Sequence, residues 1–364
     1  MAHVTIDSRW INTSGIGTYL TNVLPGVIRQ NTDVEFLLLG DTSKLLKLCG
    51  SFPNAEFKNF SEPMYSISEQ LKYPQIIPTS TDLYFATHFN VPILSRHRFL
   101  VTVYDLFHLA NPALVNSLVK SAYARLMFQI IKRRAKNIIT ISEFSKKEFN
   151  RLVGPPECEI HAIPLGITNE PDESSELSDP KNADHAPYIL YVGNIKPHKN
   201  LNRFIDSFIK IKDKVPHKLI LVGKKDGFLS GDGCIGKLVK AHSDRINLTG
   251  FVDKQRLDNL YRSADIFVFP SLYEGFGFPP LEAMVRNCPT LVSNAASIPE
   301  VCGDASLYFD PENTEDMSQK LHYLLTNNEL RRDLVQKGLE RVTHFDWNNT
   351  IDRTSTVLRE TLSK

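Results

Sequence analysis

Residues 266–284 read IFVFPSLYEGFGFPPLEAM. Four apolar residues open this stretch and predict a buried β-strand. Two glycines in its middle let the backbone come close to a ligand, and two consecutive prolines suit the first turn of a helix. The stretch therefore predicts a strand–loop–helix unit, with Glu274 in the loop and Glu282 one turn into the helix.

The same alternation extends in both directions. Short runs rich in Ile, Val and Leu predict strands at 3–6, 34–39, 82–85, 100–104, 137–141, 188–192, 218–222, 266–269, 290–292 and 306–308. Between them, apolar residues recur at helical spacing, as in 16–27 and 201–209. Continuous apolar strands that alternate with helices are typical of βαβ units and of parallel sheets covered on both faces.

Residues 169–187 interrupt this pattern with six acidic residues and almost no large apolar side chain. Such a segment predicts an exposed linker. We therefore expect two Rossmann-like, doubly wound parallel-sheet α/β domains at 1–168 and 188–345, facing across a cleft, and a helix at 346–364 that crosses back to the first domain. Ligands of doubly wound sheets bind at the carboxyl ends of the strands.

The overall composition excludes several classes of protein. A net charge of +1 gives no global attraction to nucleic acid, so we expect no nucleic-acid partner. The five cysteines are odd in number and widely spaced, which predicts reduced thiols rather than a disulfide framework or a zinc site. The N-terminus does not resemble a signal peptide, and no apolar run reaches the ~18 residues of a membrane span. We expect a soluble, cytoplasmic protein.

The turn after the strand at 188–192 is suited to an anion. A glycine is followed by Lys196 and Lys199, and then by the N-terminus of a helix. Free N–H groups and the positive end of the helix dipole favour phosphate at such a place. The alternative is a solvated loop in which Asn200 caps the helix.

Glu274 and Glu282 allow three interpretations. As carboxylates they accept strong hydrogen bonds, which suits the hydroxyl groups of a sugar. Two carboxylates are also the acid and nucleophile pair of glycoside hydrolases. The third interpretation is a surface glutamate and a glutamate on a capped helix, without chemistry.

The wider sequence resembles glycosyltransferase family 4, retaining enzymes of the two-domain GT-B fold. The resemblance is strong over residues 188–347. Beyond 266–284 it rests on Gly250-Phe251-Val252, Leu260-Tyr261, Ala264-Asp265, Ser293-Asn294, Pro299-Glu300-Val301 and Asp310-Pro311. In the first half the matches are weaker and comprise Ser14–Tyr19, Thr140–Ser145 and Ile163–Gly166.

The resemblance implies a role for each matching residue. Glu274 is similar to the glutamate that holds hydroxyls of the donor sugar, Glu282 to the one that holds the ribose, and Lys199 to the diphosphate lysine. Backbone contacts to the donor are implied at Gly15, Gly17, Gly223, Val252, Gly275, Phe276 and Gly277. Lys224, next to one of these glycines, is a further candidate.

Two positions depart from the family pattern. Asn194 stands where many members have an arginine on the diphosphate, so Lys196 is expected to supply that charge. Tyr104 stands where many have a histidine. We expect the next residue, Asp105, to be the polar group near the reacting sugar carbon, with Tyr104 and His108 as second choices. The alternative for Asp105 is a cap at the end of a strand.

These departures are similar to those of enzymes that build bacterial surface polysaccharides. The resemblance implies retaining transfer of a hexose to a glycan or lipid-linked acceptor, as in lipopolysaccharide synthesis, with Lys199, Glu274 and Asp105 in the catalytic site. GDP-mannose is the favoured donor, and a UDP- or dTDP-sugar is the alternative. No further cofactor is expected, and because Asp-x-Asp is absent we expect no metal.

Other functions remain open at this point. An epimerase would convert the nucleotide-sugar without an acceptor, and a non-catalytic relative would bind nucleotide without turnover. A glycosidase would act on glycans without any nucleotide. A dinucleotide dehydrogenase is disfavoured because no Gly-x-Gly-x-x-Gly follows the first strand.

Residues 117–137 predict a basic amphipathic helix. They contain six lysines and arginines, no acidic residue, and an apolar stripe at Leu118, Ala122, Leu126 and Ile130. Such a helix is suited to the surface of an anionic membrane, which would place the protein at the inner face of the cell membrane. The alternative is a packed helix with a solvated basic face.

Overall fold

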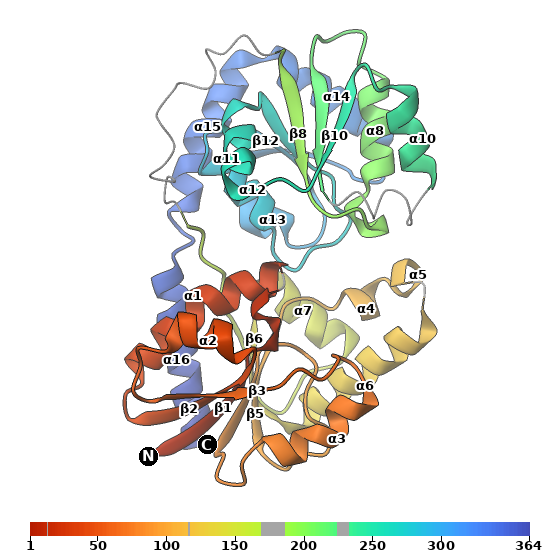
Figure 1. The fold of residues 1–364 in the computed structure, drawn as a ribbon. Coiled ribbons are helices and arrows are strands. Elements are labelled where there is room, and N and C mark those ends of the chain that lie inside the picture. The colour runs from red at the N-terminus through yellow and green to blue at the C-terminus, as the bar shows by residue number, and fades with distance from the viewer. Residues whose placement is uncertain (13, 116, 169–185, 224–232) are drawn as a thin grey trace. The chain divides into compact units, whose positions relative to one another are not determined.

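The chain forms two compact units, residues 1–166 with 346–364, and residues 167–345. The computed structural model describes residues 1–12, 14–115, 117–168, 186–223 and 233–364 (Figure 1). The unit boundaries lie within two residues of the domain ends expected at 168 and 345. Most of the expected linker at 169–187, and Lys224, lie outside the described residues.

Unit 1 is built on a seven-stranded parallel sheet with the order β3-β2-β1-β4-β5-β6-β7. Its strands are β1 (Ala2–Asp7), β2 (Val34–Gly40), β3 (Ala55–Asn59), β4 (Leu83–Ala86), β5 (Arg98–Val103), β6 (Ala135–Thr140) and β7 (Glu159–Ala162). Its helices are α1 (Ser14–Gln30), α2 (Thr42–Cys49), α3 (Ile67–Ile76), α4 (Phe107–Ala110), α5 (Pro112–Val115), α6 (Leu118–Arg134), α7 (Glu143–Leu152) and α16 (Trp347–Ser363). A short 3-10 helix, Arg9–Asn12, follows the first strand.

Unit 2 has a six-stranded parallel sheet with the order β10-β9-β8-β11-β12-β13. Its strands are β8 (Tyr188–Val192), β9 (Lys218–Val222), β10 (Ile246–Gly250), β11 (Ile266–Phe269), β12 (Thr290–Ser293) and β13 (Ser306–Phe309). Its helices are α8 (Leu201–Ile209), α10 (Gly233–Ala241), α11 (Lys254–Ser263), α12 (Phe278–Met284), α13 (Ile298–Cys302), α14 (Thr314–Thr326) and α15 (Asn328–Val342). A 3-10 turn, Pro197–Lys199, precedes α8.

The predicted fold class is confirmed, because both sheets are parallel and are connected through helices. All ten strands expected from the apolar runs are present. Three further strands, β3, β7 and β10, were not predicted. Each lies at the edge of its sheet and carries exposed or half-buried polar residues, so it lacks the continuous apolar run of a central strand.

The register of the strands sets where the chain leaves each sheet. Asp7 at the end of β1 aligns with Ala86 at the end of β4, and Val103 of β5 aligns with Thr140 of β6. In unit 2, Val192 of β8 aligns with Val222 of β9. The loops that follow these strands therefore emerge together at the carboxyl edge of each sheet, where ligands of such sheets bind.

The C-terminal residues close unit 1 rather than unit 2. Residues 347–363, expected to form a helix that crosses back, form α16, which packs on α1 and on β6. Thr350 of α16 donates to the Pro164 carbonyl at 2.8 Å, and Asn137 of β6 donates to Thr361 at 2.9 Å. Asp346 caps the helix by accepting from the Asn348 N–H at 3.0 Å.

In the part of the chain that the structure describes, no helix combines the length and apolar character needed to cross a membrane. Among the described residues, Cys49, Cys158, Cys288 and Cys302 are not joined in disulfides. Burial raises the pKa of the Cys49 thiol to about 11, which makes it a poor nucleophile.

Candidate functional site

The carboxyl ends of two neighbouring strands, β8 and β11, carry the charged centre of unit 2. Lys199 follows β8 and Glu274 follows β11, and Lys199 Nζ lies 2.5 Å from Glu274 Oε1. The two side chains are 18% and 17% exposed, and the ammonium also lies 5.5 Å from the centre of the Phe269 ring. Two residues assigned from the sequence to different parts of one ligand are thus in direct contact.

The backbone beside this pair is shaped by glycines at the ends of adjacent strands. Gly193 and Gly223 follow β8 and β9, and a Cβ on Gly223 would lie 2.2 Å from the Gly193 carbonyl oxygen. Gly193 N–H donates to the Val222 carbonyl at 2.9 Å, and Gly223 N–H to that of Gly250 at 3.2 Å. The main chain at this edge is accessible because no side chain covers it from these positions.

The cationic turn keeps its charges partly in solvent. Asn194 and Lys196 are exposed, and the pKa of His198 is lowered to about 4, chiefly by burial and also by Lys199. A cavity of about 270 Å³, lined in part by Lys196 and Arg203, lies beside the turn. Neutral His198 leaves the lysines as the cations of this turn.

The alternative role of Asn200 as the side-chain cap of α8 is wrong. Asn200 occupies the N-cap position with a left-handed backbone, φ +57°, but its side chain makes no capping bond. Instead it is buried and donates to the Pro311 carbonyl at 2.7 Å. Among the described residues, the residue at the N-cap position therefore does not cap α8 with its side chain. A helix N-terminus without such a cap is suited to an anion.

A buried serine, Ser297, fixes the backbone of the loop that carries Glu274. The Ser297 hydroxyl lies 2.9 Å from the Glu274 carbonyl oxygen and 2.6 Å from that of Phe276. Leu272 N–H donates to the His198 carbonyl at 2.8 Å and joins this loop to the cationic turn. Gly277 has φ +138°, a conformation that favours glycine, and leads directly into α12.

Glu282 has a different environment from Glu274. Its Oε2 accepts from the Tyr261 hydroxyl at 3.0 Å, and its carbonyl accepts from Arg286 at 2.8 Å. Burial raises the pKa of Glu282, although the Tyr261 hydrogen bond and the Arg286 charge oppose that rise. The two glutamates thus have separate partners, Lys199 for Glu274 and Tyr261 for Glu282.

The remaining residues implied in unit 2 lie at the same edge. Val252, after β10, is buried, whereas its neighbour Phe251 is 80% exposed. Gly275 and Phe276 are buried within the loop after β11.

The expected residues of unit 1 lie at the carboxyl edge of its own sheet. Gly15 is exposed at a kink in α1, and a Cβ on Gly17 would lie 2.8 Å from the Ile11 carbonyl. Asp105 accepts from the Phe107 N–H at 3.0 Å, so it does cap the turn after β5. The Tyr104 carbonyl is fixed by the Ser145 hydroxyl at 2.9 Å, and Tyr104 packs edge-on against Tyr19.

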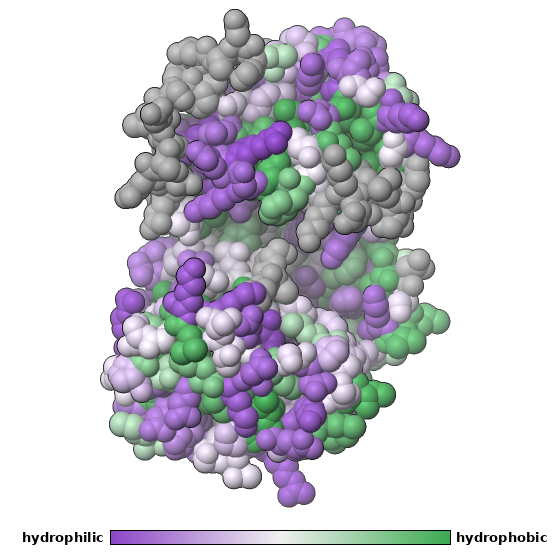
Figure 2. All heavy atoms as spheres, in the orientation of Figure 1, coloured by the Kyte–Doolittle hydropathy of each residue, from purple (hydrophilic) through white to green (hydrophobic). Residues whose placement is uncertain are grey.

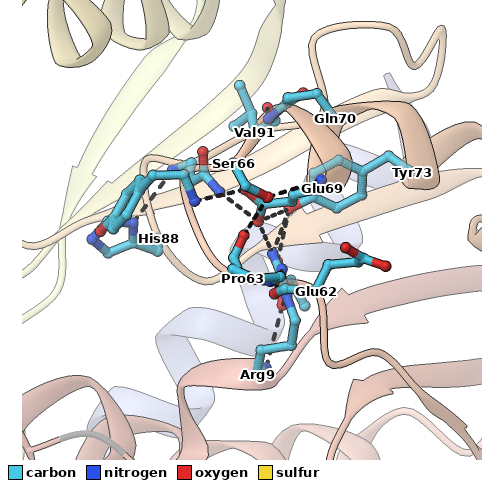
Figure 3. A network of polar contacts seen from close by, with 12 residues as sticks. Arg9, Glu62, Pro63, Ser66, Glu69, Gln70, Tyr73, His88 and Val91 are labelled. Atoms are coloured by element: carbon cyan, nitrogen blue, oxygen red, sulfur yellow. Dashed lines mark hydrogen bonds and ion pairs between the residues drawn. The ribbon is translucent and has the colours of Figure 1, made fainter. Parts of the chain in front are cut away.

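A buried ionic network at the same edge was not predicted from the sequence (Figure 3). Arg9 lies 2.6 Å from Asp7 and 2.5 Å from Glu69, with side-chain exposures of 3%, 4% and 0%. Burial would raise the pKa of Asp7, but the charge and hydrogen bonds of Arg9 hold it below its usual range. The sequence signal for this network was two charged residues, Asp7 and Arg9, immediately after the first apolar strand.

Among the described residues, His, Cys, Asp and Glu nowhere gather in threes that could hold a metal ion. Metal-independent chemistry stays a prediction, because this arrangement alone does not test it.

Replacing Ser297 with alanine tests how the loop is held. The change leaves two buried carbonyls without their partner, which costs about 1–3 kcal/mol of stability. Because one of them belongs to Glu274, we also expect roughly tenfold weaker binding of the nucleotide-sugar that the resemblance implies. Calorimetric titration and thermal unfolding measure the two effects.

Ser207→Ala is the matched control. The buried Ser207 hydroxyl also lies near two carbonyl oxygens, of Arg203 at 2.7 Å and Thr314 at 3.2 Å, but on the far part of α8. It should lower stability without affecting the ligand. Equal affinity losses in both variants would show that Ser297 acts only through general stability.

Comparison with known proteins shows which family the chain resembles. The family described as glycosyl transferases group 1 matches residues 173–341. The chain is 31% identical over 229 residues to O-antigen chain mannosyltransferase B of Escherichia coli, covering 60% of this chain and 59% of that protein. It is 26% identical over 263 residues to O-antigen chain mannosyltransferase RfbU of Salmonella typhimurium, covering 72% and 69%. The first match thus spans less than two thirds of its relative.

Solved structures share the fold over the full chain at low identity. Sucrose-phosphate synthase from Thermosynechococcus elongatus has a TM-score of 0.78 at 16% identity, with complete coverage of both chains. Anabaena Alr3699/HepE, in complex with UDP and glucose, has a TM-score of 0.74 at 16% identity, covering 99% of this chain and 100% of that one. The resemblance to glycosyltransferase family 4 is confirmed at this level: residues 173–341 match the glycosyl transferases group 1 family, and the two parallel-sheet units match the GT-B fold of solved structures.

Proposed function

We propose that the protein is a retaining, metal-independent hexosyltransferase that moves mannose from GDP-mannose to a glycan or lipid-linked acceptor in surface polysaccharide synthesis. The observation that carries this proposal is the contact between Lys199 and Glu274 at the carboxyl edge of unit 2. In this proposal Lys199 binds the leaving diphosphate and Glu274 binds hydroxyls of the sugar. The two residues lie side by side, as the diphosphate and the sugar do in a nucleotide-sugar.

The reaction needs stabilisation of charge that grows on the leaving diphosphate. Lys199, Lys196 and the N-terminus of α8 supply positive potential at one place. Glu274 would accept hydrogen bonds from hydroxyls of the donor sugar, and Glu282 from the ribose. Asp105 of unit 1 is proposed as the polar group near the reacting carbon.

The choice of mannose rests on the relatives. Two proteins similar to this chain are named O-antigen chain mannosyltransferases, from Escherichia coli and Salmonella typhimurium. The HepE structure contains UDP and glucose, so a UDP-sugar is the alternative donor on this fold. The base is expected to contact main chain near Val252.

The proposal predicts transfer of mannose from GDP-mannose to octyl α-mannoside, a soluble stand-in for a lipid-linked saccharide. We expect release of GDP and formation of an α-linked disaccharide, seen by mass spectrometry and by the anomeric C–H coupling in NMR. Lys199→Ala should lower the turnover number by roughly 10²–10³-fold, because it removes the cation at the leaving group.

Lys210→Ala is the control, because Lys210 is also an ion-paired lysine, 2.9 Å from Glu315, at the other end of α8. A β-linked product, conversion of the nucleotide-sugar without acceptor, or unchanged turnover in Lys199→Ala would contradict the proposal.

We also propose that α6 rests on an anionic membrane. Its buried face consists of Ala124, Met127, Phe128 and Ile131. Leu118 and Leu126 of the other apolar stripe are 89% and 51% exposed, and in Figure 2 hydrophobic residues lie along the edge of unit 1 that α6 occupies in Figure 1. Ile130, the last residue of this stripe, is partly buried and packs against the core of unit 1, whereas Leu118 and Leu126 lie outside the packed face of the helix.

Two of the cations on α6 bond to backbone carbonyls, and three others are exposed to solvent. Lys132 and Arg134 point to backbone carbonyls of Val153 and Ile93, at 3.1 and 2.8 Å. Lys120, Arg125 and Arg133 are exposed. An exposed apolar stripe with free cations beside it favours the membrane interpretation over a solvated basic face.

Co-sedimentation with vesicles tests this contact. The protein should bind vesicles that contain phosphatidylglycerol and not vesicles of phosphatidylcholine alone. Leu118→Ser with Leu126→Ser should reduce binding, because each removes apolar area from the interface. Leu46→Ser with Leu71→Ser, leucines that are 54% and 58% exposed on α2 and α3, serves as the control. Equal losses in both pairs would contradict the proposal.

A further inference from the structure

Three rings gather at the carboxyl edge of unit 1 outside the residues assigned above. Trp10 follows β1, His88 follows β4, and Tyr65 lies in the loop before α3. The ring centres of Trp10 and His88 are 4.4 Å apart, and Tyr65 lies 5.8 Å from Trp10 and 5.9 Å from His88. Phe89, buried beneath, is 4.2 Å from His88.

Tyr65 is held in an unfavourable backbone conformation while its ring stays accessible. Its φ is +65°, a region that residues other than glycine rarely adopt, and 44% of the residue is exposed. Its N–H donates to Glu69 Oε2 at 2.8 Å, which holds the strained turn. Strain of this kind persists where the surrounding structure fixes it, and such positions concentrate at binding sites.

The buried network reaches each of the three segments that carry the rings. Arg9, which immediately precedes Trp10, contacts Glu69 (Figure 3). Glu69 in turn accepts from the backbone N–H of Tyr65. Asn90 donates to Glu69 Oε1 at 2.7 Å, and its own N–H donates to His88 Nδ1 at 3.4 Å. A single carboxylate therefore links the three segments that carry the rings.

The chemistry of the surface formed by these three rings suits a sugar. Burial lowers the pKa of His88 to about 3, so its ring is neutral and adds no charge to the aromatic surface. The Asp105 carboxylate is close enough to Tyr65 to raise the pKa of its hydroxyl, after the larger effect of burial and the effects of Tyr123 and Glu69. Aromatic faces pack on the C–H face of a pyranose, and a carboxylate accepts from its hydroxyls.

We propose that Trp10, Tyr65 and His88 form the surface that binds the acceptor saccharide, with Glu69 as the residue that positions them. The inference rests on the proposed function for the word acceptor, but the surface lies wholly within unit 1 and is separate from the donor residues of unit 2. The surface lies next to the loop after β5, because the ring centre of His88 is 6.5 Å from that of Tyr104, the residue before Asp105.

Saturation-transfer NMR with mannobiose tests the surface without any turnover. Irradiation of the aromatic protons should transfer saturation to the ring protons of mannobiose, and Tyr65→Ala should abolish most of that transfer. In the transfer assay Tyr65→Ala should raise the acceptor KM about tenfold and leave the KM for GDP-mannose unchanged. Tyr65→Phe should retain most of the binding, because the ring is kept.

Tyr323→Ala is the control, since Tyr323 is 51% exposed on α14 of unit 2. Glu69→Gln should raise the acceptor KM while the KM for GDP-mannose stays fixed, as a positioning residue predicts. Wild-type binding of mannobiose that requires Tyr65, without mannose transfer, would support the surface and contradict the proposed function. Mannose transfer with an acceptor KM unchanged in Tyr65→Ala would overturn the surface alone.

Discussion

The contact between Lys199 and Glu274 depends on a constraint of parallel sheets. The two residues are 75 positions apart in the chain, and they meet because β8 and β11 are neighbours whose carboxyl ends lie at one edge. Moving two charges partly out of water costs desolvation free energy, and their mutual attraction does not fully offset that cost. The loops on both sides are correspondingly fixed, by Ser297 beneath Glu274 and by the bond from Leu272 to His198.

Unit 1 follows the same constraint with more deeply buried charges. Arg9, Asp7 and Glu69 are almost fully removed from solvent, and burying them is tolerated because each carboxylate has a cation and further donors. Glu69, for example, accepts hydrogen bonds from the Tyr73 hydroxyl, the Asn90 side chain and the Tyr65 backbone N–H. Removing one member of such a network leaves the others unpaired. A buried charge at the sheet edge therefore helps to position the segments that carry the surface rings.

The two sites differ in how far the sequence predicts them. In unit 2 the functional residues stand in short linear stretches, because one strand–loop–helix unit supplies Glu274, the glycines and Glu282. In unit 1 the network joins Asp7, Glu69, Asn90 and Tyr123, which come from four different segments. The pairing of β1 with β4 brings the first and third of these segments together, and α3 and α6 supply the other two residues. His88 gives no functional signal in the sequence, since a single histidine carries no spacing pattern.

Local patterns also misled where tertiary contacts decide the outcome. Asn200 has the residue type and position of a helix cap, yet its side chain bonds to Pro311 across the unit. The stripe of Leu118 and Leu126 has the spacing of a packed face, yet the helix packs through Met127 and Phe128. The edge strands β3, β7 and β10 were missed because their polar residues face solvent. Composition predicts central strands well, since these are apolar on both faces.

The central claim is that Lys199 and Glu274, although paired, bind different parts of one donor. Calorimetric titration of GDP and of GDP-mannose into the wild type, Lys199→Ala and Glu274→Gln tests it most directly. The account predicts that Lys199→Ala weakens both ligands about equally, because the diphosphate is common to them. Glu274→Gln should weaken GDP-mannose and spare GDP. Equal losses for both ligands in both variants would contradict the separation of tasks.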